Sequence, residues 1–227
     1  MSNSMPLHPA PRRDRPSDGR RAKGLRSRNT LLTEAVQLAS VDGLEGLTIS
    51  SLAERLGTAK SSVHAAFGSK EALQIAAIRR AREMLIELVV APALTVPAGL
   101  ARLEALGESW FSYLQSDVFE GGCLLCSASA EMDGRPGPTR DAVAAVMAEW
   151  LQLLAESIAA GVDQGDFASS TMPDQIAFEL NAIGMAANWH HQLFGGQTAF
   201  TLARRAWADA LAQLHPQPSP RRRRSKP

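Results

Sequence analysis

Residues 48–73 contain two short stretches in which apolar residues recur every three or four positions, with a single glycine between them. The recurring residues are Ile49, Leu52, Ala53 and Leu56 before the glycine, and Val63 and Phe67 after it. Gly57 permits the tight turn that brings two short helices onto one small core. The pattern predicts a helix-turn-helix, in which one side of the second helix is left free to enter the major groove of DNA.

The free side of the second predicted helix carries small or hydrogen-bonding side chains, which allow a helix to approach base edges and phosphates. Thr48 and Ser69 are placed to cap the helices that follow them, and helix starts with exposed amides bind phosphate. We therefore predict DNA contacts from Arg28, Thr48, Thr58, Lys60, Ser61, Ser62, His64 and Lys70. The alternative interpretation is that the two helices only contribute to an ordinary helical core.

Further motifs flank this segment in order along the chain. They are a helical stretch over 31–39, the run Gly43-Leu44-Glu45-Gly46-Leu47-Thr48-Ile49, and the ending Phe67-Gly68-Ser69-Lys70-Glu71-Ala72-Leu73. On these residues, the chain resembles the TetR/AcrR family of bacterial transcription regulators from about Arg26 to Leu73. The resemblance implies an all-α fold of about nine helices, with a three-helix DNA-binding domain and a larger helical domain for effector binding and homodimerisation.

Three departures from the family pattern fall on the second helix of the motif and the residues just before it. Thr58-Ala59 stands where the family usually has Val-Ser, so we expect Thr58 to cap the helix. Ser61-Ser62 replaces the usual Gly-Thr, and His64 replaces the usual Tyr, which typically reaches a phosphate. These differences change the expected operator contacts and keep the general mode of binding.

The composition agrees with a helical protein of two domains. Alanine and leucine are abundant, aromatic residues make up 5% of the 227 residues, and no segment alternates as a strand does. We divide the chain into a disordered basic arm (1–24), a helix-turn-helix DNA-binding domain (25–75), a helical effector-binding and dimerisation domain (76–215), and a disordered basic tail (216–227).

The net charge of +1 conceals strongly basic ends. Residues 1–28 contain eight Lys or Arg against two Asp, and residues 216–227 contain five cations and no acid, so the body between them is acidic. The leading arm is expected to add salt-sensitive affinity for DNA, and the acidic body argues against a general nucleic-acid packaging protein. We see no signal peptide and expect no run long enough to cross a bilayer, which predicts a cytoplasmic protein without a membrane partner.

The only cysteines, Cys123 and Cys126, form a C-x-x-C at the predicted start of a helix, where the helix dipole lowers a thiol pKa. This spacing suits a thiol redox sensor or a dithiol enzyme. It equally suits two small apolar residues that pack one turn apart in a helical core. Because no second Cys or His pair lies nearby at ligand spacing, we predict no metal site, and neither a cofactor nor an enzymatic activity is indicated.

The helix predicted over 173–194 is apolar on two sides. We assign one side, together with a stripe on the last helix, to an intermolecular four-helix bundle that gives the homodimer a two-fold axis. These residues are Ile176, Leu180, Ile183, Ala187, Phe200, Trp207 and Leu211. The alternative is that both sides are buried within one subunit.

The opposite side of the same helix combines large apolar side chains with neutral hydrogen-bonding groups, as a small-molecule pocket does. We assign it, with aromatic and methionine residues of the preceding helices, to an unidentified small-molecule effector. The predicted pocket residues are Trp110, Phe111, Met132, Met147, Trp150, Phe178, Asn181, Met185, Asn188 and Trp189. Together these interpretations predict a repressor that binds a palindromic operator as a homodimer and releases it when the effector binds.

Overall fold

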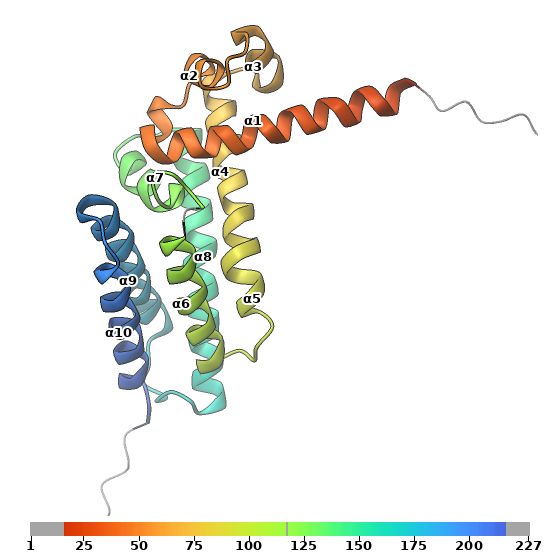
Figure 1. Ribbon diagram of the computed structural model, residues 1–227. Coiled ribbons are helices and arrows are strands. Elements are labelled where there is room, and N and C mark those ends of the chain that lie inside the picture. The colour runs from red at the N-terminus through yellow and green to blue at the C-terminus, as the bar shows by residue number, and fades with distance from the viewer. Residues whose placement is uncertain (1–15, 117, 217–227) are drawn as a thin grey trace, which may run out of the picture.

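Helices account for all the regular secondary structure in the part of the chain that the computed structural model describes, which is residues 16–116 and 118–216, with side chains from residue 29 onwards (Figure 1). The helices are α1 (Pro16–Gly46), α2 (Ile49–Arg55), α3 (Lys60–Phe67), α4 (Lys70–Leu85), η1 (Ile86–Val90), α5 (Ala91–Ala93), α6 (Leu100–Gln115), α7 (Leu124–Met132), α8 (Pro138–Gln164), α9 (Pro173–Phe194) and α10 (Thr198–Gln213). Because α4, η1 and α5 run on without a break, these described residues form nine helical rods. The expected all-α fold is confirmed.

The first three helices form a small unit at one end of the molecule (Figure 1). Its core consists of side chains that repeat at helical spacing, namely Ala35, Val36, Ala39, Leu52, Ala53, Val63 and Phe67. The helical run of α1 is interrupted at Gly43, whose φ of 75° and ψ of 172° lie outside the helical region. Glycine adopts a positive φ without steric cost, so the chain can turn here toward α2.

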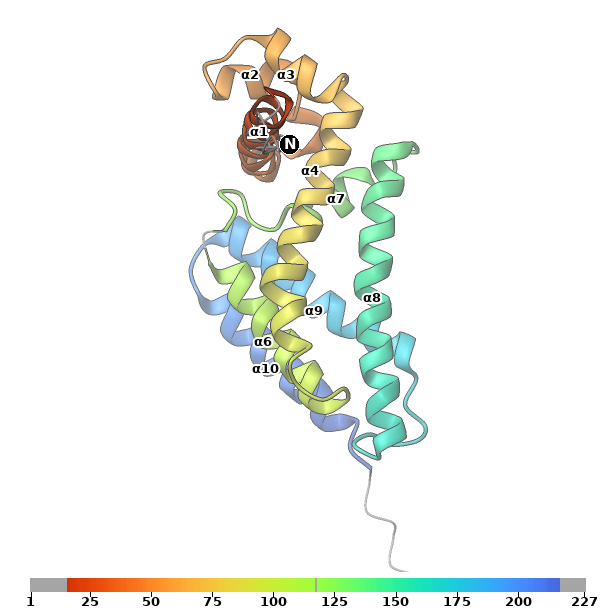
Figure 2. The same cartoon turned by 90° about the vertical axis from the view of Figure 1, so that its right-hand side faces the viewer.

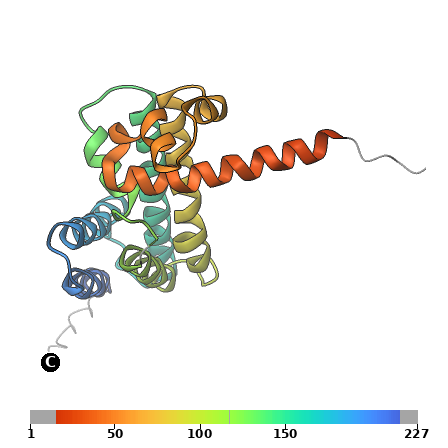
Figure 3. The same cartoon turned by 45° about the horizontal axis from the view of Figure 1, so that its top comes forward.

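The described part of α1 begins at Pro16, so residues 16–24, which we expected to be disordered, are helical in the structure. The reason is local: proline is favoured in the first turn of a helix, an acid near that start complements the helix dipole, and Arg, Ala and Lys favour the helix. Figure 3 shows this end of α1 projecting away from the other helices. Residues 1–15 of the predicted arm and 217–227 of the predicted tail lie outside the described residues.

A single rod made of α4, η1 and α5 links the small unit to the larger helical domain. The helix runs on from Leu85 to Ala93 through a π-helical turn over Ile86–Val90. In a regular α-helix, the ring of Pro92 would meet the carbonyl of Leu88, and proline has no N–H to donate. The wider π turn immediately before the proline relaxes that register, so the rod tolerates the proline near its end.

α6, α8, α9 and α10 build the larger domain, and α8 packs against both α4 and α9 (Figure 2). α10 packs on α9 and α6, while α7 contacts α1 and α8. An aromatic cluster occupies the centre. The Trp110 ring of α6 meets Trp150 of α8 edge-on with centroids 4.8 Å apart, and Trp207 of α10 lies 5.6 Å from the ring of Phe111.

α8 is long and apolar enough, by length and composition alone, to cross a bilayer. We expected no such run, and that expectation is wrong. In the structure α8 packs against α4, α6, α7 and α9, and it buries Val146, Trp150 and Leu154. Of the apolar window of α8, 33% is buried, so packing within the subunit accounts for part of its apolar composition.

Candidate functional site

The outward face of α3 is the surface on which the predicted DNA contacts gather. Val63 is fully buried and Phe67 nearly so, and α3 packs through them on α2 and α4. The exposed residues at and before α3 include Thr58, Lys60, Ser61, Ser62 and His64, together with Ala59 and Ala65. The structure thus places five of the predicted contact residues on one solvent-facing surface, and their contact with DNA stays a prediction.

The start of α3 differs from our expectation. Ala59, rather than Thr58, is the N-cap residue, with a φ of −71° and a ψ of 138°, and no side chain caps the helix. Thr58 lies one residue too early, and its backbone amide donates to the carbonyl of Ala53 at 2.9 Å, which ties it to the end of α2. Helix geometry leaves amides of the first turn without helical partners, and a phosphate is a suitable acceptor for them.

The three remaining predicted contacts have different surroundings. Thr48 caps α2 as expected: its hydroxyl accepts from the Ser51 amide at 3.0 Å, and its amide donates to the Ser51 hydroxyl at 2.9 Å. Lys70 Nζ lies 3.0 Å from Glu45 Oε2, and the hydrogen bond from Lys70 lowers the pKa of the Glu45 carboxyl. Lys70 therefore reaches a phosphate only by sharing or leaving Glu45. Arg28 belongs to α1, and its side chain lies outside the described residues.

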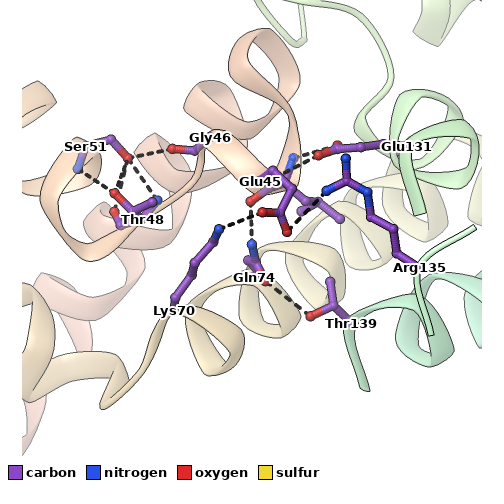
Figure 4. A network of polar contacts seen from close by, with 10 residues as sticks. Glu45, Gly46, Thr48, Ser51, Lys70, Gln74, Glu131, Arg135 and Thr139 are labelled. Carbon is purple, nitrogen blue, oxygen red and sulfur yellow. Dashed lines mark hydrogen bonds and ion pairs between the residues drawn. The ribbon is translucent and has the colours of Figure 1, made fainter. Parts of the chain in front are cut away.

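The last turn of α1, after the kink at Gly43, is held by side chains of α7 and α4 (Figure 4). Glu131 of α7 accepts hydrogen bonds from the backbone amides of Leu44 and Glu45, both at 2.8 Å. Gln74 of α4 donates to the Leu44 carbonyl at 2.5 Å and accepts from Thr139 of α8 at 3.2 Å. We call this set of contacts the Glu131 junction. Three helices, α4, α7 and α8, thus meet at the turn that precedes the helix-turn-helix.

The loop before α7 makes a second junction with the DNA-binding unit. The side chain of Gln37 accepts from the Glu120 amide at 2.9 Å, and the hydroxyl of Ser40 accepts from the Gly121 amide at 3.0 Å. Arg55 of α2 pairs with the Glu120 carboxylate. A Cβ at Gly121 would lie 2.1 Å from the Ser40 carbonyl oxygen, so this close approach requires glycine. The larger domain is therefore attached to α1 and α2 at two separate places.

An inner pocket lies between α4, α6, α7 and α8. It is lined by Leu85, Trp110, Cys123, Leu125, Cys126, Val146, Met147 and Trp150. None of these side chains carries a formal charge at neutral pH, except where a thiol ionises. Trp150 is 4% exposed, and its indole Nε1 has no hydrogen-bond partner. Trp110, Met147 and Trp150 were predicted as pocket residues, whereas Leu85 and Val146 were not.

Comparisons with known proteins address both parts of this arrangement. Residues 31–77 match the model described as "Bacterial regulatory proteins, tetR family", and residues 99–207 match "Tetracyclin repressor-like, C-terminal domain". The two matches follow each other in the order of the two structural units and together span most of the chain. The chain belongs to the TetR family. A search of the curated proteins found no match.

Solved TetR-family structures share the fold. A TetR transcriptional regulator from Chloroflexus aurantiacus J-10-FL has 24% identity and a TM-score of 0.78, with 85% of this chain and 97% of that chain covered. A TetR-family regulator from Cytophaga hutchinsonii has 22% identity and a TM-score of 0.76, with coverage of 86% and 98%. AibR, in complex with isovaleryl coenzyme A and operator DNA, has 18% identity and a TM-score of 0.65, with coverage of 83% and 98%.

Within this TetR-family fold, several predicted pocket residues lie elsewhere. Phe178 and Trp189 are 65% and 59% exposed, so assigning them to an interior pocket is wrong for the subunit. Asn188 is buried, and its Oδ1 accepts from the Cys123 amide at 3.1 Å, which leaves that oxygen occupied. Phe111 lines a different groove, between α6 and α10. Of the other three, Met132 is buried, Met185 is partly buried, and Asn181 has a buried Oδ1 without a partner.

The predicted dimer face is also largely turned inward. Ile176 and Ile183 are partly exposed, but the other five residues, Leu180, Ala187, Phe200, Trp207 and Leu211, are buried within the subunit, so that part of the assignment is wrong. The reason is the small-residue side of α9, where the ring of Trp110 packs directly onto Gly184. The large apolar residues that α9 and α10 expose to solvent are Phe178, Trp189, Leu193, Phe194 and Leu202.

The two cysteines of the TetR-family chain line the inner pocket rather than the surface. Cys123 is the N-cap residue of α7, and Cys126 follows in its first turn; both are buried and reduced. A hydrogen bond with the Cys126 thiol, assisted by the Tyr113 hydroxyl 3.8 Å away, lowers the pKa of Cys123 to about 7, while the pKa of Cys126 is raised. Thiol reactivity also needs access, which this burial restricts.

Proposed function

We propose that this chain is a one-component transcriptional repressor in the cytoplasm, which binds a palindromic operator as a homodimer and releases it when a small molecule fills the larger domain. The observation that carries the proposal is the exposed polar face of α3, whose other side buries Val63 and Phe67 in the core. The two junctions support the regulatory part, because they join the larger domain through direct hydrogen bonds to α1, which packs on α2 of the helix-turn-helix. AibR, crystallised with a small molecule and operator DNA, supports the two partner classes.

The operator contacts can be tested with single substitutions on α3. Lys60→Ala and His64→Ala should each weaken operator binding by roughly tenfold, and Lys60→Ala should also reduce the slope of affinity against salt concentration by about one. DNA fragments selected from a random pool by the purified protein would supply the operator, and fluorescence anisotropy would measure affinity. Arg205→Ala removes one exposed cation of α10, away from α3, and should bind normally. Unchanged affinity in both α3 variants would contradict the proposal.

The homodimer is supported by an apolar groove of about 230 Å³ between α9 and α10. Small side chains line much of it and would allow helices of a second copy to approach closely. Its lining consists of Ile183, Ala186, His190, Leu202 and Ala206, with the buried Ala187, Ala199 and Ala203 completing it within the subunit. Burial of this face and of the exposed aromatics beside it in a two-fold interface would remove a large apolar surface from water.

Leu202→Glu should weaken self-association by at least about a hundredfold, because a carboxylate would be buried in an apolar interface without a partner. Thr201→Glu places the same charge on the neighbouring exposed position outside the groove and is the matched control. Sedimentation velocity over a range of protein concentrations measures the monomer–dimer equilibrium. A Leu202→Glu variant that still dimerises like the control would rule out this face.

A further inference from the structure

The carboxylate of Glu45 is shared by two cations that come from different parts of the chain (Figure 4). Glu45 Oε2 lies 3.0 Å from Lys70 Nζ, at the start of α4, and Glu45 Oε1 lies 3.7 Å from a guanidinium nitrogen of Arg135, in the loop between α7 and α8. The hydrogen bond from Lys70 and the charges of both cations lower the pKa of the Glu45 carboxyl, so it is ionised at neutral pH. Lys70 and Arg135 thus compete for one negative charge.

The backbone that carries this carboxylate is anchored. The Glu45 amide donates to Glu131 Oε1 at 2.8 Å, and Gln74 Nε2 donates to the carbonyl of the preceding residue, Leu44, at 2.5 Å. Glu45 therefore cannot withdraw from the two cations by a backbone movement unless these hydrogen bonds break. The division of its charge between the cations depends on their two side chains.

Lys70 is the member of this network that we also predict to contact DNA. It is the first residue of α4, a helix of 16 residues whose positive end is a suitable site for a phosphate. Its side chain is 40% exposed and borders an open hollow of about 340 Å³, which leaves the ammonium room to move. A phosphate and the Glu45 carboxylate would bind the same ammonium, so the internal ion pair opposes the contact with DNA.

Arg135 draws on the same carboxylate from the opposite side of the network. Within the described residues, its guanidinium forms an ion pair with Glu45 alone, and its side chain is 55% exposed. An ion pair of this exposure changes an equilibrium by roughly two- to fivefold. Because the two cations share one carboxylate, Arg135 weakens the hold of Glu45 on Lys70 and offsets negative charge beside the ammonium.

We propose that Glu45 lowers the affinity for operator DNA by holding Lys70, and that Arg135 is a positioning residue that restores part of this affinity by pairing with the same carboxylate. These roles rest on the proposed function, in which the chain binds operator DNA through its helix-turn-helix. They assign part of the affinity for DNA to a side chain of the α7–α8 loop, which lies outside the helix-turn-helix.

Fluorescence anisotropy on the full chain, with the selected operator fragment, tests the role of Glu45. Glu45→Gln removes the charge at nearly constant size and should tighten binding by roughly two- to fivefold more than Glu71→Gln. Glu71 is the matched control, because it is an exposed acid next to Lys70 that forms no ion pair within the described residues. Lys70→Ala should weaken binding and lower the slope of affinity against salt concentration by about one. In that background, the two glutamine variants should bind equally.

The role of Arg135 is tested by the opposite effect. Arg135→Ala should weaken operator binding by roughly two- to fivefold relative to Arg140→Ala, which removes a cation that borders the same hollow and pairs with Asp141. Arg135→Lys retains the charge and should bind like the unmodified chain. In the Glu45→Gln background no carboxylate is left to share, so Arg135→Ala should bind no more weakly than Arg140→Ala.

Four results would each overturn these roles: equal binding by Glu45→Gln and Glu71→Gln, a gain from Glu45→Gln that persists in Lys70→Ala, equal binding by Arg135→Ala and Arg140→Ala, or a loss from Arg135→Ala that persists in Glu45→Gln. Lys60→Ala, measured in the same assay, separates the two proposals. If Lys60→Ala weakens binding and the Glu45 and Arg135 variants do not behave as expected, only the roles of these two residues fail. An unmodified chain without preference for the selected fragment over random DNA contradicts the proposed function itself.

Discussion

Gly184→Ala should destabilise the folded chain by about 2–3 kcal/mol, although alanine is normally favoured over glycine in a helix by about 1 kcal/mol. Gly184 is buried on α9, and a Cβ there would lie 2.0 Å from Cζ3 of Trp110. The indole cannot move aside easily, because Trp150 lies 4.8 Å and Trp207 lies 6.4 Å from it, centroid to centroid. The steric overlap therefore outweighs the gain in helix propensity.

Urea unfolding followed by circular dichroism measures this change in the free energy of unfolding. Gly134→Ala is the matched control, because a Cβ at Gly134 has no neighbour within 4 Å and should leave stability within about 0.5 kcal/mol of the unmodified chain. A Gly184→Ala variant as stable as this control would mean that Trp110 does not pack on α9 as the structure has it.

The contact between Trp110 and Gly184 also explains why the sequence alone did not predict which side of α9 faces the core. Both of its sides are apolar, so periodicity alone could not decide which side faces the core. The inward side is determined by Trp110 of α6. Its ring packs against the backbone of α9 at a position where a glycine leaves room for it. Gly107 under Trp207 and Gly161 under Phe167 repeat this arrangement. A glycine within α9, considered together with the large aromatic residues of the other helices, is the sequence feature that could have predicted its inward side.

The helix-turn-helix was predictable because its determinants are local. Thr48 caps α2 through a residue three positions away, and the buried Val63 and Phe67 stand one turn apart in a single short helix. Thr58 was misplaced by one residue, which is the usual uncertainty of a helix boundary. The Glu131 junction could not be predicted, because Glu131 binds backbone amides 86 and 87 positions away in the chain. In the sequence, Glu131 cannot be distinguished from an acidic residue that merely faces solvent on a helix.

Glu131→Ala should weaken operator binding by at least about tenfold without touching the surface of α3. The substitution removes both hydrogen bonds to the amides of Leu44 and Glu45, each 2.8 Å long. A hydrogen bond to a charged group contributes roughly 1.5–3 kcal/mol when shielded, and less at the exposed Glu45 amide. Because these amides stand in the last turn of α1, just after the kink at Gly43, their release loosens the angle at which the chain leaves α1 toward α2.

Amide hydrogen exchange separates this effect from a general loss of stability. Leu44 and Glu45 should exchange at least tenfold faster in Glu131→Ala, whereas amides in the core of α8 should keep their protection. Glu131→Gln retains one acceptor oxygen and should fall between the alanine variant and the unmodified chain. Asp133→Ala removes the same charge from an exposed site at the end of α7 and should leave both readouts unchanged. If Glu131→Ala bound operator like Asp133→Ala, the junction would hold the turn without controlling DNA recognition.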